Sequence, residues 1–182
     1  KRVDLVLTFS SIEVPRYRQQ FKAGHTQFDF IPLGYDFSSQ PAGDEGYIFS
    51  GGRSNRDYQT LVEALKDDAV PTRIVAQRHN LDGIHLPNHV QAFYGVFGVE
   101  FDRFIANAHL VVVPLDRADE SSGQLVVLQA MAYGKPVIVT ENAGILDYVE
   151  PGTDSLVVPP HDCQALRSAI LRVSGDHDLW QQ

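Results

Sequence analysis

Two hydrophobic patterns alternate along the chain. Short apolar runs of strand length recur, and between them lie segments in which apolar residues return every three or four positions. This alternation is typical of βαβ units around a parallel sheet. The run at 110–115 is apolar at almost every position, which places it in the middle of a sheet covered on both faces. The pattern therefore predicts an α/β fold with a doubly wound parallel sheet and helices on both faces.

The same pattern gives the expected elements and their grouping. Strands are expected at 3–9, 28–34, 47–50, 72–76, 90–95, 110–115, 135–140 and 155–158. Helices are expected at 14–21, 57–66, 101–108, 125–134, 145–150 and 162–173. Residues 35–46 are rich in Ser, Gly, Pro and acidic residues, as linkers are. We expect one βαβ step over 1–36, a linker over 37–46 and a complete doubly wound domain over 47–182.

Composition narrows the class of protein. A chain of 182 residues with 43% hydrophobic residues can bury one good core but hardly two full domains. With 15 basic against 23 acidic residues and a net charge of -8, it lacks the positive field that nucleic acid requires. No apolar run approaches the roughly 18 residues that span a bilayer. The single Cys163 favours a reducing compartment, and a start at Lys1 directly before a strand suggests a piece of a longer protein.

Candidate chemistry begins at the first strand of the complete domain. In a doubly wound sheet, ligands bind beyond the carboxyl ends of the strands, here the loops after Ser50, Gly95, Leu115 and Thr140. The sequence SGGRSNRDY over 50–58 places two glycines and two arginines before a helix, a set of groups suited to a diphosphate. The Walker spacing and the G-x-G-x-x-G fingerprint are absent. The same residues would also fit a turn with two solvated arginines.

A second motif covers residues 118–140, ADESSGQLVVLQAMAYGKPVIVT. Small residues at 121–123 precede a helix, so their backbone N–H groups can point at an anion, and Gln129 lies about two turns further on. The alternative is an acidic, solvated loop that caps a core helix. A third segment, the turn at 142–144, falls at the same edge of the sheet.

Five segments in order carry a resemblance to a known family. They read GGRSNRDYQTLVEA, HVQAFYG, AHLVVVP, SSGQLVVLQAMAYGKPVIVT and DYVEPGTDSLVVPPHD. From about Gly46 to Leu171 the chain resembles the carboxyl-terminal, donor-binding domain of the GT-B glycosyltransferases, in the retaining, family-four-like group 1. Residues 1–36 resemble the last βαβ step of the amino-terminal acceptor domain. The resemblance implies a Rossmann-like half of a GT-B fold.

The resemblance also implies roles for the first two motifs. Gly52 matches a glycine whose backbone approaches the donor phosphate, Arg53 matches the phosphate-binding arginine, and Arg56 stands where the family usually has lysine. Arginine keeps the positive charge and adds a forked donor. The helix N-terminus matches the backbone that meets the phosphate and the sugar. The residues implied in donor phosphate binding are Gly52, Arg53, Arg56, Ser122, Gly123 and Gln124.

The family's pair of glutamates, separated by seven residues, is altered here. Gln129 replaces the second glutamate, which holds the ribose, and an amide still accepts from a hydroxyl. The first, which lies near the transferred sugar, falls on Ser121 by strict counting, or on Glu120 if the loop carries one extra residue. These two residues are the catalytic candidates. The positions that match the donor sugar or base edge are Gly95, Phe97 and Gly144.

A glycosyltransferase that acts with retention is therefore implied, with a nucleotide-diphosphate sugar as donor and a glycan, lipid or polysaccharide precursor as acceptor. No cofactor and no metal are expected, because the sequence has no Asp-x-Asp motif and no His/Cys ligand spacing. This part alone is expected to be inactive, since transfer needs both halves of the cleft. The expected location is the cytoplasm or the inner face of a membrane.

Two other classes of protein have features in common with this sequence. A binding relative that has lost transfer would tolerate the altered glutamate pair. A receiver-type signalling domain has a similar α/β shape but needs acidic residues at the end of its first strand, where this chain has Gly51, Gly52 and Arg53. The sequence therefore favours a nucleotide-binding domain over a receiver-type domain.

Overall fold

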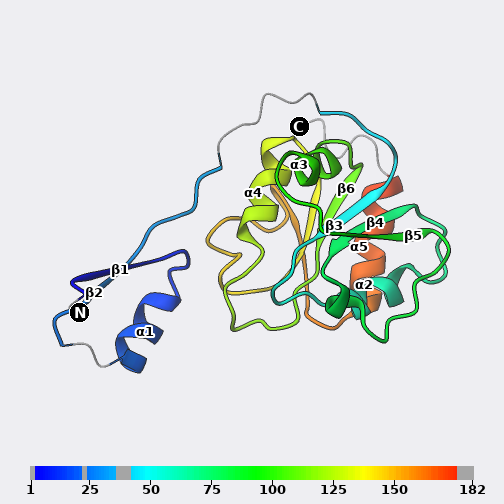
Figure 1. Ribbon diagram of the computed structural model, residues 1–182. Helices are drawn as coiled ribbons and strands as arrows, with labels where there is room; N and C mark the ends of the chain where they lie inside the picture. The colour runs from blue at the N-terminus through cyan, green and yellow to red at the C-terminus, as the bar shows by residue number, and fades with distance from the viewer. Residues whose placement is uncertain (1–2, 22–23, 36–41, 176–182) are drawn as a thin grey trace.

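The computed structural model describes residues 3–21, 24–35 and 42–175 (Figure 1). Two sheets lie within these residues, one of two strands near the N-terminus and one of six strands after residue 42. Residues 37–41 of the expected linker and 176–182 of the expected donor domain lie outside the described residues. Among the described residues, no helix is long and apolar enough to cross a membrane.

The N-terminal segment is a single βαβ step. Strand β1 (Leu5–Thr8) pairs in parallel with β2 (Gln27–Phe30), and helix α1 (Glu13–Phe21) lies between them in the chain. Phe28 of β2 is buried, with the Phe21 ring stacked on it at a centroid distance of 6.4 Å. An aromatic cluster therefore holds α1 against one face of the pair.

The second sheet is parallel throughout and has the strand order β5-β4-β3-β6-β7-β8. The strands are β3 (Ile48–Gly51), β4 (Thr72–Ala76), β5 (Val90–Tyr94), β6 (Leu110–Val113), β7 (Val137–Thr140) and β8 (Leu156–Val158). The chain starts at β3, builds outward to β5, then returns to the other side of β3 with β6. This is the order of dinucleotide-binding folds, and its switch point lies between β3 and β6. The predicted doubly wound fold is confirmed.

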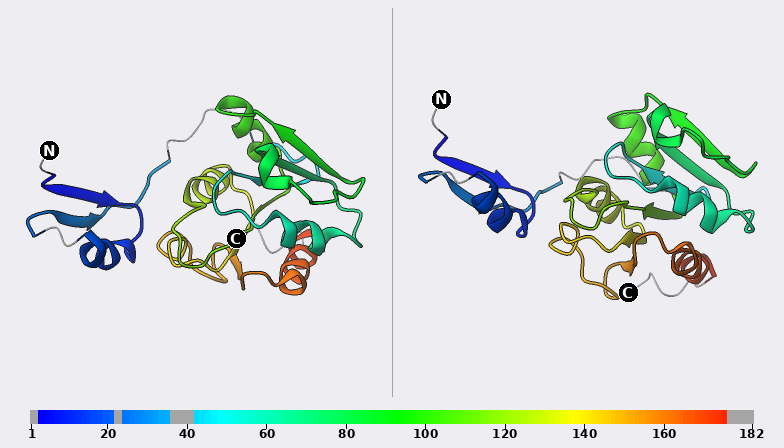
Figure 2. Two further views of the ribbon diagram at one scale, coloured as in Figure 1. Left: turned by 60° about the horizontal axis from the view of Figure 1, so that its bottom comes forward. Right: turned by 90° about the horizontal axis from the view of Figure 1, so that it is seen from below.

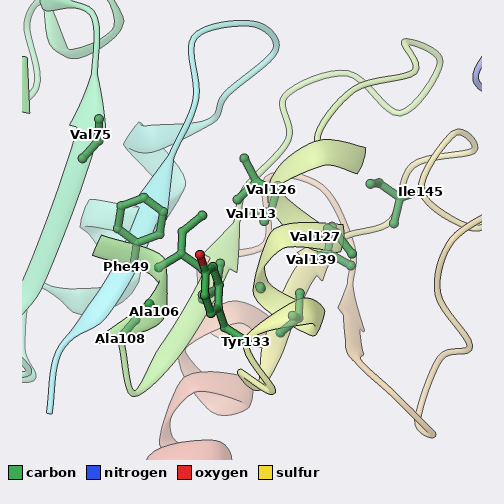
Figure 3. Packing of buried hydrophobic residues seen from close by; sticks show 14 of the residues in the cluster. Phe49, Val75, Ala106, Ala108, Val113, Val126, Val127, Tyr133, Val139 and Ile145 are labelled. Atoms are coloured by element: carbon green, nitrogen blue, oxygen red, sulfur yellow. The ribbon is translucent and has the colours of Figure 1, made fainter. Parts of the chain in front are cut away.

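Helices cover both faces of this sheet (Figure 2). One face carries α2 (Tyr58–Leu65) and α5 (Cys163–Gly175), and the other carries α3 (Val99–Ala106) and α4 (Gln124–Ala132). All four residues of β6 are fully buried, two toward each pair of helices. Figure 3 shows the cluster on this side, to which the sheet contributes Phe49, Val113 and Val139 and α4 contributes Val127, which lies beside Val139. A strand buried on both faces is the reason that the sequence from 110 is apolar throughout.

The prediction of a helix at 145–150 is wrong. This segment forms consecutive turns, in which Ile145 N–H donates to Asn142 O (3.0 Å) and Tyr148 N–H donates to Ile145 O (2.8 Å). Six residues can form too few helical bonds to offset the cost of the first turn. Contacts to the N-terminal segment hold the turns instead. The Tyr148 hydroxyl accepts from Leu33 N–H (3.0 Å) and donates to Phe9 O (2.7 Å).

A neighbouring carboxylate makes the same kind of contact. Asp147 Oδ2 accepts from Ser11 N–H (2.8 Å) and Asp147 Oδ1 accepts from Ser11 Oγ (2.6 Å). The turns at 142–148 therefore connect the N-terminal segment to the carboxyl edge of the larger sheet. A short 3-10 helix, η1 (Arg78–Leu81), is a further element that the sequence pattern did not predict.

Candidate functional site

A cavity of about 810 Å³ lies at the carboxyl edge of the six-stranded sheet. One wall is built by the loops after β3, β5 and β6, and the opposite wall by the N-terminal segment, including Leu7, Phe9 and Tyr17. Most of the residues singled out in the sequence line this cavity: Gly52, Arg53, Arg56, Gly95, Phe97, Ser121, Ser122, Gly123, Gln124 and Gln129. Loops far apart in the sequence are thus brought to one place by the strand order.

The loop after β3 is shaped by a glycine and an arginine. Gly52 has φ of 131°, and a Cβ on it would lie 2.5 Å from the guanidinium of Arg56. Arg56 Nε–H donates to Gly51 O (3.0 Å) and Nη1–H donates to Ser54 O (2.8 Å). Burial lowers the pKa of Arg56 below its ordinary value. Arg56 therefore supports the loop from behind and keeps a positive charge next to the cavity, with only part of its five N–H groups used by these carbonyls.

Arg53 extends across the cavity mouth. Its side chain is exposed, and its guanidinium carbon lies 5.3 Å from the centroid of the Phe97 ring in the loop after β5. The contact is a cation–π interaction between two exposed groups. Asn80 of η1 fixes the backbone behind it, because Asn80 Nδ2 donates to Arg53 O (3.0 Å). Two residues predicted to contact the donor thus touch each other from different loops.

The N-terminus of α4 opens onto the same cavity. Gly123 is the N-cap with φ of 90°, and a Cβ there would lie 3.0 Å from Val113 Cγ1. Only glycine fits this backbone conformation and this space without strain. Gln124 Nε2 contacts Ser121 Oγ, and Ser122 Oγ accepts from Asn55 Nδ2 (2.8 Å). The free N–H groups expected at a helix start, together with the helix dipole, make this end suited to an anion.

Two asparagines that sequence reasoning missed hold the loop before α4. Asn55, in the left-handed region with φ of 53°, accepts from Arg117 N–H (2.8 Å) and donates to Arg117 O (3.0 Å). Asn142 Nδ2 donates to Arg117 O (2.8 Å) and to Glu120 O (2.7 Å). The loop is therefore fixed from both sides. Both lie in segments that the sequence analysis singled out, after β3 and β7 on either side of β6, but there they look like ordinary turn asparagines and nothing in the sequence indicates their bonds to this loop.

The structure separates the two catalytic candidates. Ser121 lines the cavity, whereas the Glu120 side chain pairs with Arg117 (Nη1 to Oε2, 3.3 Å) and is absent from the cavity lining. Glu120 instead lines a smaller cavity that Ser121 also reaches. Gly144 does not line the main cavity either, but packs against Ser121, since a Cβ on Gly144 would lie 2.5 Å from Ser121 Oγ.

Gln129 reaches the cavity from the second turn of α4. Its Nε2 donates to Asp102 Oδ1 (2.9 Å) of α3, and the Tyr35 hydroxyl donates to the same oxygen (3.2 Å). Burial, together with the charge of Asp102, raises the pKa of Tyr35, so the phenol remains protonated as this donor. No motif in the sequence pointed to Asp102.

Three possible metal ligands gather outside the lining of the main cavity, namely Asp57, Asp116 and His161. Asp57 is the N-cap of α2, and its oxygens accept from Thr60 N–H (2.9 Å) and Thr60 Oγ1 (2.6 Å). His161 Nδ1 contacts the same carboxylate at 2.9 Å. The Asp57 carboxylate therefore has a structural role as the cap of α2. None of the three residues lines the main cavity.

The strand order and the cavity define a Rossmann-like α/β domain of the GT-B type. Residues 55–176 match the model of the family described as glycosyl transferases group 1. Since the match covers more than half of the chain, the chain belongs to this family. A segment of 58 residues is 38% identical to sucrose-phosphate synthase 4 of Arabidopsis thaliana, and one of the same length is 36% identical to sucrose-phosphate synthase of Zea mays. Each segment is 32% of this chain, and they are 6% and 5% of the two relatives.

Solved structures share the fold over nearly the whole chain. Sucrose-phosphate synthase of Thermosynechococcus elongatus aligns with a TM-score of 0.78 at 23% identity, covering 99% of this chain and 51% of its own. Anabaena HepE in complex with UDP and glucose aligns with a TM-score of 0.78 at 20% identity, covering 97% and 55%. The chain thus spans about half the length of these structures.

Proposed function

We propose that this chain is the donor-binding part of a glycosyltransferase that transfers a sugar from a nucleotide-diphosphate sugar to an acceptor hydroxyl with retention. The proposal rests mainly on one observation: the β3 loop, the N-terminus of α4 and Gln129 all line the same cavity. Positive charge and N–H groups lie together at the switch point of the sheet, where folds of this kind bind phosphorylated ligands.

The proposed chemistry rests on the departing diphosphate. Arg53, Arg56 and the amides of 122–124 would neutralise the negative charge that develops as the bond between sugar and phosphate breaks. Preorganised donors of this kind act most strongly in a site that excludes water, where losing one lowers the rate by about 10²–10³. Ser121 would lie beside the sugar, Gln129 would accept from a ribose hydroxyl, and Phe97 would border the base. The proposal assigns no role to a metal ion.

UDP is the first nucleotide to test. Two of the neighbours that share the fold, Anabaena HepE and the pneumococcal transferase GtfA, are described in complex with UDP, and HepE also with UDP-glucose. The acceptor would enter from the side of the N-terminal segment, which supplies the opposite wall of the cavity. We propose a glycan, lipid or polysaccharide precursor as acceptor, and an acceptor site completed by further residues of a longer protein, in the cytoplasm or at the inner face of a membrane.

Calorimetry with UDP, GDP, ADP and their sugars tests donor binding. We expect one diphosphate to bind, with affinity unchanged by EDTA, and Arg53→Ala/Arg56→Ala to weaken it by about 30-fold or more, as expected for losing two charge-assisted contacts. Arg103→Ala/Arg172→Ala removes two exposed arginines outside the cavity and should leave binding unchanged. Equal affinity in both double variants would rule out the phosphate assignment.

Transfer itself is a separate test. With a radiolabelled donor and an acceptor panel, we expect a longer protein that includes the whole acceptor half to transfer the sugar and this chain alone not to. The anomeric configuration of the product, read by NMR, decides retention. Tight nucleotide binding without any transfer by the longer protein would instead favour a binding relative that has lost transfer, an alternative that the replacement of a glutamate by Gln129 allows.

A further inference from the structure

The carboxylate of Asp102 lies directly behind the amide of Gln129, and nothing in the proposed function uses it. Asp102 Oδ1 accepts from Gln129 Nε2 at 2.9 Å and from the Tyr35 hydroxyl at 3.2 Å. Asp102 is half-buried on α3, which packs beside α4, and it is absent from the lining of the main cavity, whereas Gln129 is part of that lining. The carboxylate therefore contacts a cavity-lining amide without itself lining the cavity.

This contact determines which way the amide faces. An ionised carboxylate can only accept hydrogen bonds, so the group that meets Asp102 must be the NH2 and not the oxygen. Because the amide is planar and its two polar atoms point apart, Gln129 Oε1 is directed away from Asp102. The negative charge also polarises the amide through the hydrogen bond, which makes its oxygen a stronger acceptor.

The same contact gives a reason for glutamine at position 129. A glutamate there would place a second carboxylate about 3 Å from Asp102, and two like charges at that distance cannot both be ionised without a large cost. Glutamine removes this repulsion and gains a charge-assisted bond. Positions 102 and 129 thus behave as one unit in which the negative charge lies on α3 and the acceptor oxygen on α4.

We propose that Asp102 is a positioning residue for nucleotide recognition, which orients and polarises the Gln129 amide so that its oxygen accepts from a ribose hydroxyl. This inference rests on the proposed function, because it assumes that a nucleotide occupies the cavity. It adds a residue that does not contact the ligand and a specific consequence, the discrimination between a ribose and a sugar without the two hydroxyls.

The test compares the affinities of UDP and 2′,3′-dideoxy-UDP for the full chain by calorimetry, with the GDP and ADP pairs in parallel. We expect the wild type to prefer UDP by about three- to tenfold, the worth of one hydrogen bond. Gln129→Ala and Asp102→Asn should both bring the ratio toward one while diphosphate binding persists. Glu100→Gln removes the same charge from an exposed position of α3 and should preserve the ratio.

A charge exchange gives a readout that loss of structure cannot imitate. In Gln129→Glu the two adjacent carboxylates should share a proton at low pH and repel at high pH, so the UDP preference should fall as the pH is raised. Adding Asp102→Asn should restore a preference that no longer depends on pH. Because the two nucleotides carry the same diphosphate, its titration cancels in their ratio.

The outcomes separate the two proposals. If none of the nucleotide pairs binds the wild type, the proposed function fails. If UDP binds, and Gln129→Ala removes the ribose preference while Asp102→Asn keeps it, the positioning role alone is overturned. If Asp102→Asn loses its fold, as a thermal melt would show, a pH-independent ratio in Gln129→Glu still overturns the role.

Discussion

Replacing Gly123 by alanine tests whether the N-terminus of α4 is held in place by its fit to the sheet. Gly123 has φ of 90°, and a Cβ there would lie 3.0 Å from Val113 Cγ1 and 3.4 Å from both Ile145 Cδ1 and Leu115 Cδ2. Val113, Leu115 and Ile145 are fully buried, so none can move freely. The substitution therefore combines an unfavourable backbone conformation with overpacking of the core.

The expected loss of stability follows from these two effects. A left-handed backbone costs a residue with a Cβ about 1–2 kcal/mol, and extra volume in a packed core about 1–3 kcal/mol. The lower entropy of unfolded alanine returns about 0.4–1 kcal/mol. Gly123→Ala should thus lower the free energy of unfolding by about 1–5 kcal/mol, with a central value of about 3 kcal/mol. Urea denaturation measures it, since a shift of the midpoint at constant slope reports stability alone.

Gly83 is the matched control. It has φ of 78° and nothing within 4 Å of its Cβ position, so Gly83→Ala incurs the backbone cost without the clash. We expect a loss of about 1 kcal/mol there. If Gly123→Ala were no less stable than Gly83→Ala, the fit of Gly123 against Val113 would not hold the helix start. If it were less stable but bound nucleotide as tightly as the wild type, the helix start would not bind the diphosphate.

Three further changes have expected outcomes. Asn142→Ala removes both bonds to the loop at 117–120 and should cost about 1–3 kcal/mol in urea denaturation, with faster proteolysis of that loop; unchanged cleavage would contradict the clamp. Asp57→Ala removes the N-cap of α2 and should cost about 0.5–2 kcal/mol, whereas Asp57→Asn should lose less. The hydrogen bond from Arg167 lowers the pKa of Asp68, so its stabilisation is present above the unfolded pKa and is lost as pH falls through the folded one. Arg167→Gln should therefore flatten the decline in stability below about pH 4, and an unchanged profile would show that the pair contributes nothing.

The sheet could be predicted from the sequence because its central strand is an apolar run without polar residues. Every residue of β6 is buried, and an apolar run of this length leaves the middle of a parallel sheet as the consistent place. Once that strand is central, the loops after β3, β5 and β6 must meet at one edge. Arg53, Phe97 and Gln129 line one cavity because of the strand order, so their proximity could be predicted from the sequence.

The side-chain contacts within the site could not be predicted from the sequence. Asp102 and Asn55 act through partners 27 and 62 residues away, and sequence spacing carries no signal for such pairs. The segment at 145–150 looked helical because its apolar residues have a helical period. Its backbone instead forms local turns, and the Tyr148 side chain bonds to the N-terminal segment, a tertiary preference that the local pattern does not contain.

The turns at 142–148 have a mechanical consequence. At one end, Asn142 holds the loop before α4, and at the other, Asp147 and Tyr148 make four hydrogen bonds to the N-terminal segment. Widening the cavity by moving that segment would require these bonds to break, at about 0.5–1.5 kcal/mol each. Together with the bonds from Arg16 Nη1–H to Asp119 O (2.6 Å) and from the Tyr35 hydroxyl to Asp102 Oδ1 (3.2 Å), these two side chains stiffen the cleft although they touch no proposed ligand. Because the same turns also hold the loop before α4, a displacement of one wall would be transmitted to the other.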